Sequence, residues 1–262
     1  MIAADLIAPI DATRGPFTLP DAEQWMQGRT LYGGASALVA FTALRHAYPD
    51  LPPLRAAQIG FVAPVGDTID IATGVVRQGR NVTQLRSEIV CEGATALFGT
   101  WLFGAGREAN AVKGAAGVGN ELVAPEDCQP IENTRAPAFI QGNFEIRHAL
   151  PKNDVEDTEE ARVRWWIRLR EPSGLDPLSE VILLGDTLPP SAMRVMQRPG
   201  PLSSMNWAFN VIDPAPVTRE GWWLAETASE WADAGYSSER LTLWNAHGAP
   251  VLSGLQSVAI FG

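Results

Sequence analysis

The chain has 262 residues, of which 46% are hydrophobic and 19% are charged, and its formal net charge at pH 7 is -10. This length and hydrophobic content allow one large domain or two small ones, each with a buried core. The acidic balance disfavours nucleic acids and anionic membranes as partners, because both bind basic surfaces.

The first large predicted element is a helix. Gly33 and Gly34 precede an almost wholly apolar run over residues 35–48, which stops before Pro49. A helix that is apolar on nearly every face must be buried on most sides. Strands are then predicted, between Gly-rich turn signals, at about 54–64, 68–78, 81–92 and 95–103. We expect a single helix wrapped by a mainly antiparallel sheet.

A segment of small residues with few large apolar ones follows this first unit. Its composition is typical of a flexible linker. We therefore predict three parts in the chain: a first unit over residues 1–104, a linker over 105–135 and a second unit over 136–262.

The second unit repeats the same order of elements with an extra strand before its helix. Two half-exposed strands are predicted at residues 139–149 and 160–171, because polar and apolar residues alternate there. A helix is predicted over residues 178–196, broken or bent at Pro189-Pro190. Four more strands are predicted at about 203–212, 222–233, 237–246 and 250–261.

The two units also align with each other as an internal repeat. Residues 54–61 align with 202–209 at a shift of 148 (209 − 61), and residues 93–99 align with 248–254 at a shift of 155 (248 − 93). Such a repeat predicts two similar halves about a pseudo-two-fold axis. Polar residues distinguish the second copy: Ser204 stands for Ala56, Gln256 for Trp101, and Asp186 lies in the helix-like segment.

The motifs resemble those of the acyl-CoA thioesterase II (TesB-like) family. The first copy carries Trp25, Gly28-Arg29 and Gly33-Gly34, and the second carries Gly185-Asp186, Ser204-Met-Asn-Trp and Leu255-Gln256. The resemblance covers nearly the whole chain. It implies an α+β double hotdog fold, in which each half is a long helix wrapped by a curved sheet. It also implies hydrolysis of acyl-CoA by water, with Asp186, Ser204 and Gln256 as the catalytic residues.

This residue set suits the chemistry of a thioester, which is already activated toward attack. The enzyme then has to orient a water molecule and stabilise an oxyanion, and hydrogen-bonding side chains can do both. Asp186 would be the general base, with Ser204 and Gln256 holding the water in line. No covalent nucleophile is required.

Each of the three residues also has a structural interpretation. Asp186 could cap a helical turn before the two prolines. By strand alternation, Ser204 shares its face with Asn206 and Asn210, so it could be an ordinary residue of a polar face. Gln256 lies on an apolar face and predicts a buried amide that needs partners, whether structural or catalytic.

Four further residues are candidates for substrate binding. Gly33 and Gly34 at a helix start can present free backbone N–H groups to an oxyanion or phosphate, although tight packing also explains them. Arg77 and Arg80 at one turn could meet the phosphates of coenzyme A, although arginines are common on exposed strands.

Several other enzyme classes are disfavoured. The run from Gly34 to Leu38 misses the last glycine of the GxSxG motif and lies inside a helix pattern, which argues against a serine hydrolase. The two cysteines and three histidines lack metal-ligand spacing, so we expect neither a metal nor a cofactor. No apolar run has the length of a membrane span, and residues 1–6 lack the basic segment of a secretion signal, so we expect a cytoplasmic protein with no membrane partner.

Two classes of function remain. One is an acyl-CoA thioesterase, and the other is a non-catalytic double hotdog that binds acyl-CoA or an acyl chain. We also predict further oligomerisation, because strand faces with Trp165, Trp222 and Trp244 exceed the needs of two small cores.

Overall fold

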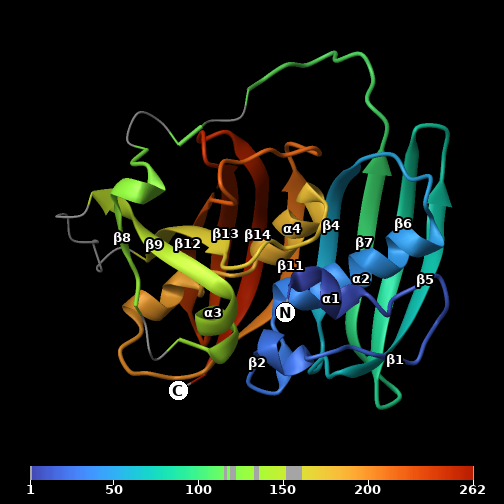
Figure 1. Cartoon of the computed structure of the whole chain (residues 1–262), viewed down its shortest axis with the longest axis horizontal. Helices are drawn as coiled ribbons and strands as arrows, with labels where there is room; N and C mark the ends of the chain where they lie inside the picture. The colour runs from blue at the N-terminus through green and yellow to red at the C-terminus, as the bar shows by residue number, and fades with distance from the viewer. Residues whose placement is uncertain (1, 115–116, 119–121, 133–135, 152–160, 262) are drawn as a thin grey trace.

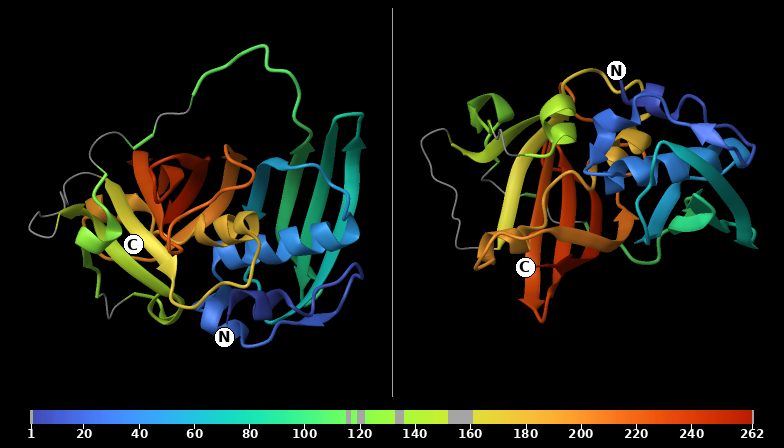
Figure 2. Two further views of the ribbon diagram at one scale, coloured as in Figure 1. Left: turned by 45° about the horizontal axis from the view of Figure 1, so that its top comes forward. Right: turned by 90° about the horizontal axis from the view of Figure 1, so that it is seen from below.

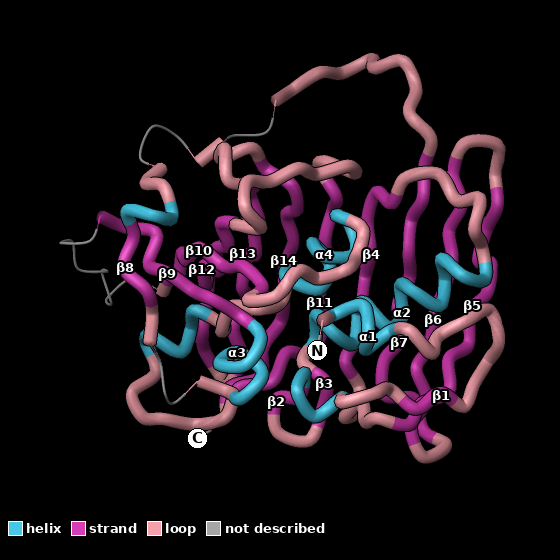
Figure 3. Tube along the Cα trace, in the orientation of Figure 1, coloured by secondary structure: helices cyan, strands magenta, loops and turns pink. Residues whose placement is uncertain are grey.

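The computed structural model describes residues 2–114, 117–118, 122–132, 136–151 and 161–261 (Figure 1). Within them the chain forms an α+β structure built on one long antiparallel sheet (Figure 3). The helices are α1 (Ala3–Ile7), α2 (Gly33–Ala47), α3 (Ala138–Asn143) and α4 (Pro177–Leu184), with 3-10 turns η1 (Ala22–Trp25), η2 (Pro125–Asp127) and η3 (Ser191–Val195).

The sheet has the strand order β1-β5-β6-β7-β4-β11-β14-β13-β12-β10-β9-β8 in the described part of the chain. Strands β2 (Met26–Gln27) and β3 (Thr30–Leu31) pair separately. The long sheet consists of β1 (Phe17–Thr18), β4 (Leu54–Phe61), β5 (Thr68–Gln78), β6 (Val82–Cys91), β7 (Ala94–Gly104), β8 (Cys128–Pro130), β9 (Phe144–Pro151), β10 (Arg162–Leu169), β11 (Leu202–Val211), β12 (Trp223–Asp233), β13 (Tyr236–Asn245) and β14 (Pro250–Ile260).

Helix α2 is the buried centre of the first half, as its apolar composition predicted. Residues 34–44 are all buried. The strands β4 to β7 curve around the helix (Figure 2). The helix ends before Pro49, because the residue ahead of a proline is disfavoured in the helical conformation.

The second half has a shorter helix, and its break lies earlier than expected. Asp176 caps α4 by accepting hydrogen bonds from the backbone N–H groups of Leu178 (3.1 Å) and Ser179 (3.2 Å). The helix ends at Leu184, and η3 resumes at Ser191, beyond Pro189-Pro190. The predicted helix over 178–196 is therefore two short pieces, with Asp186 in the connection between them.

The predicted pseudo-symmetry is confirmed by the strand order, which runs β5-β6-β7-β4 in the first half and β12-β13-β14-β11 in the second. The halves join where β4 pairs with β11. Ile59 lies opposite Trp207 in this pair, and these positions are equivalent under the repeat, since 207 − 59 is 148. Equivalent residues facing each other mark the pseudo-two-fold axis, as in a symmetric dimer.

The region in front of the second half differs from the expectation. Residues 138–143 form α3 rather than the start of a strand, and residues 125–130 of the predicted linker form η2 and β8. Other parts of the predicted linker, at 115–116, 119–121 and 133–135, lie outside the described residues, as does residue 160 of the next predicted strand. The domain boundaries remain a prediction.

Two of the three tryptophans that prompted the prediction of an oligomer, Trp222 and Trp244, are packed within the chain. Trp222 and Trp244 are 3% and 8% exposed and form a small core with Cys128, against which Leu122 and Val123 pack. They therefore offer little free surface, whereas Trp165 is half-buried, and the oligomeric state stays a prediction. Among the described residues, no helix is both long and apolar enough to cross a membrane.

Candidate active site

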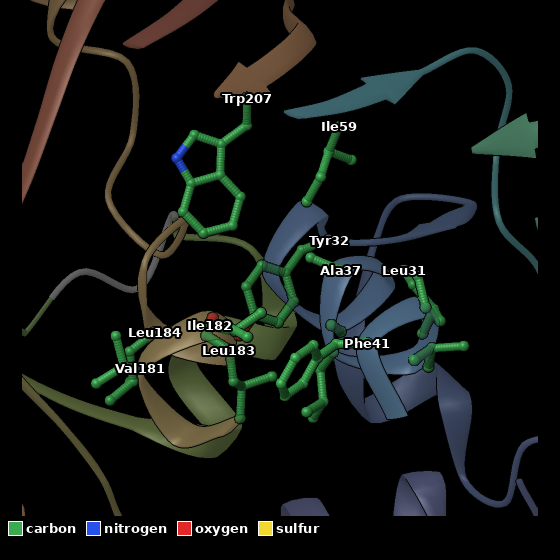
Figure 4. Close-up of a cluster of buried hydrophobic side chains, with 14 of the residues drawn as sticks. Leu31, Tyr32, Ala37, Phe41, Ile59, Val181, Ile182, Leu183, Leu184 and Trp207 are labelled. Atoms are coloured by element: carbon green, nitrogen blue, oxygen red, sulfur yellow. The ribbon is translucent and has the colours of Figure 1, made fainter. Parts of the chain in front are cut away.

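The two halves meet where the start of α2 lies against the end of α4. The hydroxyl of Tyr32, the residue before α2, donates a 2.7 Å hydrogen bond to the backbone oxygen of Leu183. A Cβ atom at Gly34 would lie 2.1 Å from the same oxygen, so only glycine permits this approach. Figure 4 shows Tyr32, Leu183 and Trp207 in the same buried cluster.

Asp186 and Gln256 are joined directly at this junction. The Nε2 group of Gln256 donates a 2.7 Å hydrogen bond to Oδ1 of Asp186. Gln256 comes from the inner face of β14 and is 3% exposed, so the predicted buried amide is present and its partner is Asp186. The capping role considered for Asp186 is not the contact that its side chain makes.

The second carboxyl oxygen of Asp186 points at the first half. A Cβ atom at Gly33 would lie 2.0 Å from Oδ2, which places this oxygen directly against the first turn of α2. The first N–H groups of an α-helix have no partner within the helix and carry its positive partial charge. The site is therefore composite, with the acid from one half and the helix start from the other.

The surroundings of Asp186 change its acidity. Burial raises the pKa of its carboxyl to about 7, and the hydrogen bond from Gln256 acts in the opposite direction. The residue is nevertheless only half-buried by its accessible surface, so protein surrounds it without sealing it from solvent. A carboxyl group with such a pKa is ionised in a substantial fraction at neutral pH.

Ser204 lies on the opposite face from the one that strand alternation predicted. A β-bulge between Ser204 and Asn206 leaves Met205 unpaired, and Met205 is 46% exposed instead of buried. Because the bulge adds one residue, Ser204 pairs with the buried Val258 and shares the inner face with Gln256. The prediction that grouped Ser204 with Asn206 and Asn210 is therefore wrong. In the described part of the chain, its hydroxyl makes no hydrogen bond to Asp186 or Gln256.

Two more polar groups near Asp186 have no partner among the described residues. These are Oγ1 of Thr187 and Nε1 of Trp207, both buried. Thr187 follows Asp186 in sequence, and the ring of Trp207 lies so close to Gly185 that a Cβ there would be 2.7 Å away. Unpaired buried groups of this kind are suited to hold a water molecule or a ligand.

One residue of this region was missed in the sequence. Glu239 on β13 is fully buried and pairs across the sheet with Gln256. In the first half the equivalent pair is Leu85 and Trp101, at shifts of 154 (239 − 85) and 155 (256 − 101). Comparison of the two copies could therefore have identified Glu239, since both members of an apolar pair are replaced by polar residues in the second copy.

Arg77 and Arg80 are not brought to this site. Both are exposed, at the hairpin between β5 and β6, and β6, β7 and β4 lie between β5 and β11 in the sheet. Their contact with coenzyme A phosphates remains a prediction. Among the described residues, no group of three or more His, Cys, Asp or Glu side chains is arranged to hold a metal ion.

Comparisons with known proteins agree with this architecture. Residues 21–104 match the sequence model of the acyl-CoA thioesterase N-terminal domain, and residues 125–260 match that of the acyl-CoA thioesterase C-terminal domain. No curated protein matched the chain.

Similar solved structures share the fold. They include a hot dog protein of unknown function from Alicyclobacillus acidocaldarius (TM-score 0.79, 20% identity, 91% of this chain and 90% of that one). A tesB protein from Mycobacterium avium subs paratuberculosis has a TM-score of 0.76 at 16% identity, with 100% of both chains covered. An acyl-CoA thioesterase II from Mycobacterium marinum has a TM-score of 0.69 at 14% identity, covering 88% of this chain and 91% of that one.

Proposed function

Because the chain belongs to the acyl-CoA thioesterase family and is thus a thioester hydrolase, we propose that Asp186 activates the water that attacks the thioester. The observation that carries this proposal is the hydrogen bond between Asp186 and Gln256 at the junction of the two halves. The products are the free carboxylic acid and coenzyme A.

The two oxygens of Asp186 have separate tasks in this mechanism. Oδ1 accepts the hydrogen bond from Gln256, which fixes the plane of the carboxyl group. Oδ2 remains available as the base that takes a proton from water. A base whose pKa is near the working pH combines a useful ionised fraction with a strong pull on the proton.

Ser204 supports the water from β11. It shares the inner face with Gln256, which is the side of the sheet that Asp186 also faces. Its hydroxyl can both donate and accept a hydrogen bond, so it can hold a water molecule in line for attack. We include Ser204 as the third member of the site on this basis.

The start of α2 supplies the stabilisation of negative charge. The thioester carbonyl oxygen becomes an oxyanion when water attacks, and we assign the N–H groups at Gly33 and Gly34 to receive it. Tight packing against Asp186 and Leu183 already requires glycine at both positions. Tight packing and oxyanion binding are compatible roles for these glycines, because the close packing of α2 against Asp186 also brings the free N–H groups near the base.

The alternative function is a non-catalytic acyl-CoA or acyl-chain binding protein. The change from an apolar pair in the first half to Glu239 and Gln256 in the second favours the hydrolase, because binding an acyl chain requires no buried polar network. A panel of acyl-CoA substrates of increasing chain length separates the two. We expect catalytic thiol release for part of the panel, whereas saturable binding without thiol release across the whole panel would support the binding protein.

A further inference from the structure

Glu239 makes a dense set of contacts below the site. Its Oε2 accepts hydrogen bonds from the backbone N–H (3.0 Å) and the hydroxyl (2.7 Å) of Ser191. Its Oε1 accepts from the backbone N–H of Ala192 (3.2 Å) and the hydroxyl of Ser237 (2.8 Å). Three of these four bonds hold the start of η3, so the carboxyl group anchors this segment to the sheet.

The hydrogen bonds of Glu239 to η3 also restrain the segment that carries Asp186. That segment leaves α4 at Leu184 and is next fixed at Ser191 by Glu239. Between them, the Thr227 hydroxyl donates a 3.0 Å hydrogen bond to the backbone oxygen of Pro189. The position of Asp186 is therefore set by α4 on one side and by contacts to β12 and β13 on the other.

Glu239 also lies next to Gln256, the hydrogen-bond partner of Asp186. Glu239 is the direct cross-strand partner of Gln256, and both side chains lie on the inner face. Glu239 is thus connected to Gln256 by strand pairing, and to the segment that carries Asp186 by its hydrogen bonds to η3. Leu85, at the equivalent place in the first half, cannot accept hydrogen bonds.

We propose that Glu239 is a positioning residue that holds the carboxyl of Asp186 and the amide of Gln256 at hydrogen-bonding distance. This inference rests on the proposed function of that pair. A direct catalytic role does not fit, because Glu239 is 0% exposed and both its oxygens are occupied by protein donors.

The test compares Glu239→Gln and Glu239→Leu with the unmodified protein. The glutamine keeps one acceptor oxygen, whereas the leucine reproduces the first-half residue and keeps none. We expect kcat to fall about 10-fold for the glutamine variant and about 100-fold for the leucine variant, in the range of a displaced catalytic group. The KM should stay within about twofold, because Glu239 is fully buried and both its oxygens accept hydrogen bonds from protein groups.

The pH profile separates positioning from a loss of stability. The Gln256 hydrogen bond lowers the pKa of Asp186, so loosening it should move the acidic limb of kcat/KM to higher pH. Tyr32 is another titratable group that faces Asp186, and its buried hydroxyl has a pKa raised well above its ordinary value, so it does not create this limb.

Glu180→Gln is the matched control. Glu180 on α4 accepts hydrogen bonds from the Ser173 hydroxyl and from Nε1 of Trp223 (2.9 Å), away from the Asp186 pair. This variant should lower the melting temperature while leaving the pH profile in place. If the Glu239 variants behave in the same way, the proposal is overturned.

Asp186→Asn distinguishes failure of this inference from failure of the proposed function. Full activity in Asp186→Asn would remove the proposed base itself. If Asp186→Asn is impaired, adding Glu239→Gln should cause little further loss of kcat, because both changes disable one unit. Fully additive losses would overturn the positioning role. Should Glu239→Leu fail to fold, Glu239→Gln and Ser191→Ala, which retains both backbone hydrogen bonds, still provide the comparison.

Discussion

Oδ2 of Asp186 occupies space that a side chain at Gly33 would need, since a Cβ atom there would lie only 2.0 Å away. Gly33 comes from the start of α2 in the first half, and Asp186 comes from the segment that follows α4 in the second. The close contact makes the proposed active site a property of the interface between the halves, and it leads to the first prediction.

Gly33→Ala should displace the Asp186 carboxyl. The new methyl group would also lie 2.9 Å from the ring of Phe61, so both the Asp186 carboxyl and the Phe61 ring have to move. We expect a loss of activity of about 100-fold and a destabilisation of about 1–3 kcal/mol. Steady-state kinetics and chemical denaturation measure the two effects. Gly66→Ala is the control, because no atom beyond Gly66 and its two chain neighbours lies within 4 Å of the Cβ position. Equal behaviour of the two variants would contradict the account.

Gln256→Ala should reduce both activity and stability. It removes the donor to Asp186 and leaves that carboxyl without its hydrogen bond. We expect a loss in kcat of about 10- to 100-fold, smaller than that for the base itself, and a destabilisation of about 1–3 kcal/mol. Ser257→Ala, on the exposed side of the same strand, is the control and should match the unmodified protein. An unchanged kcat in Gln256→Ala would argue that the amide has only a structural role.

Ser204 offers a test based on a small change of side chain. Ser204→Thr retains the hydroxyl and adds a methyl group that suits a strand, so activity should stay within about threefold. Ser204→Ala removes the hydroxyl and should lower kcat about 10-fold or more. Kinetics on both variants check the hydroxyl directly. If Ser204→Ala is as active as Ser204→Thr, Ser204 has no part in the reaction.

The raised pKa of Asp186 predicts a cost to stability at neutral and alkaline pH. The folded pKa of about 7 exceeds the ordinary value of 3.8, so the folded state holds a proton that the unfolded state has lost between about pH 4 and 7. The contribution of Asp186 to the free energy of unfolding therefore falls as the pH rises from about 4 to 7. Asp186→Asn should be more stable than the unmodified protein at pH 8, and this advantage should shrink toward pH 4.

Denaturation curves at the two pH values measure this difference. Asp213→Asn is the control, because Asp213 lies in the loop after β11 and bonds to a nearby backbone N–H of Ala215. The same stabilisation in both variants, or none in Asp186→Asn, would contradict the buried environment assigned to Asp186.

Much of the fold follows from patterns that the sequence carries locally. The apolar run after Gly34 defines α2, and the alternation in each copy defines the strands around it. The repeat then gave the pseudo-symmetry, with Ile59 opposite Trp207 at its centre. The polar differences between the copies directed attention to Asp186 and Gln256, which the structure brings together.

Other parts depend on contacts that no local pattern encodes. A bulge changes the face of Ser204, and nothing in the alternation of residues 202–211 signals one extra residue. Glu239 is a carboxylic acid in an alternating strand, which ordinarily predicts an exposed position. Its burial depends on donors from η3, far away in sequence. Likewise, Trp222 and Trp244 are buried in part by residues that were predicted to belong to the linker.

The central claim is that Asp186 is the base for attack by water, and thiol release by Asp186→Asn tests it most directly. We predict a fall in kcat of about two to four orders of magnitude, with acyl-CoA binding within about twofold. In the unmodified protein, kcat/KM should rise through about pH 7 as Asp186 ionises, and this limb should vanish in the variant. Full thiol release by Asp186→Asn, or a covalent acyl adduct trapped on any side chain of the unmodified protein, would contradict the account.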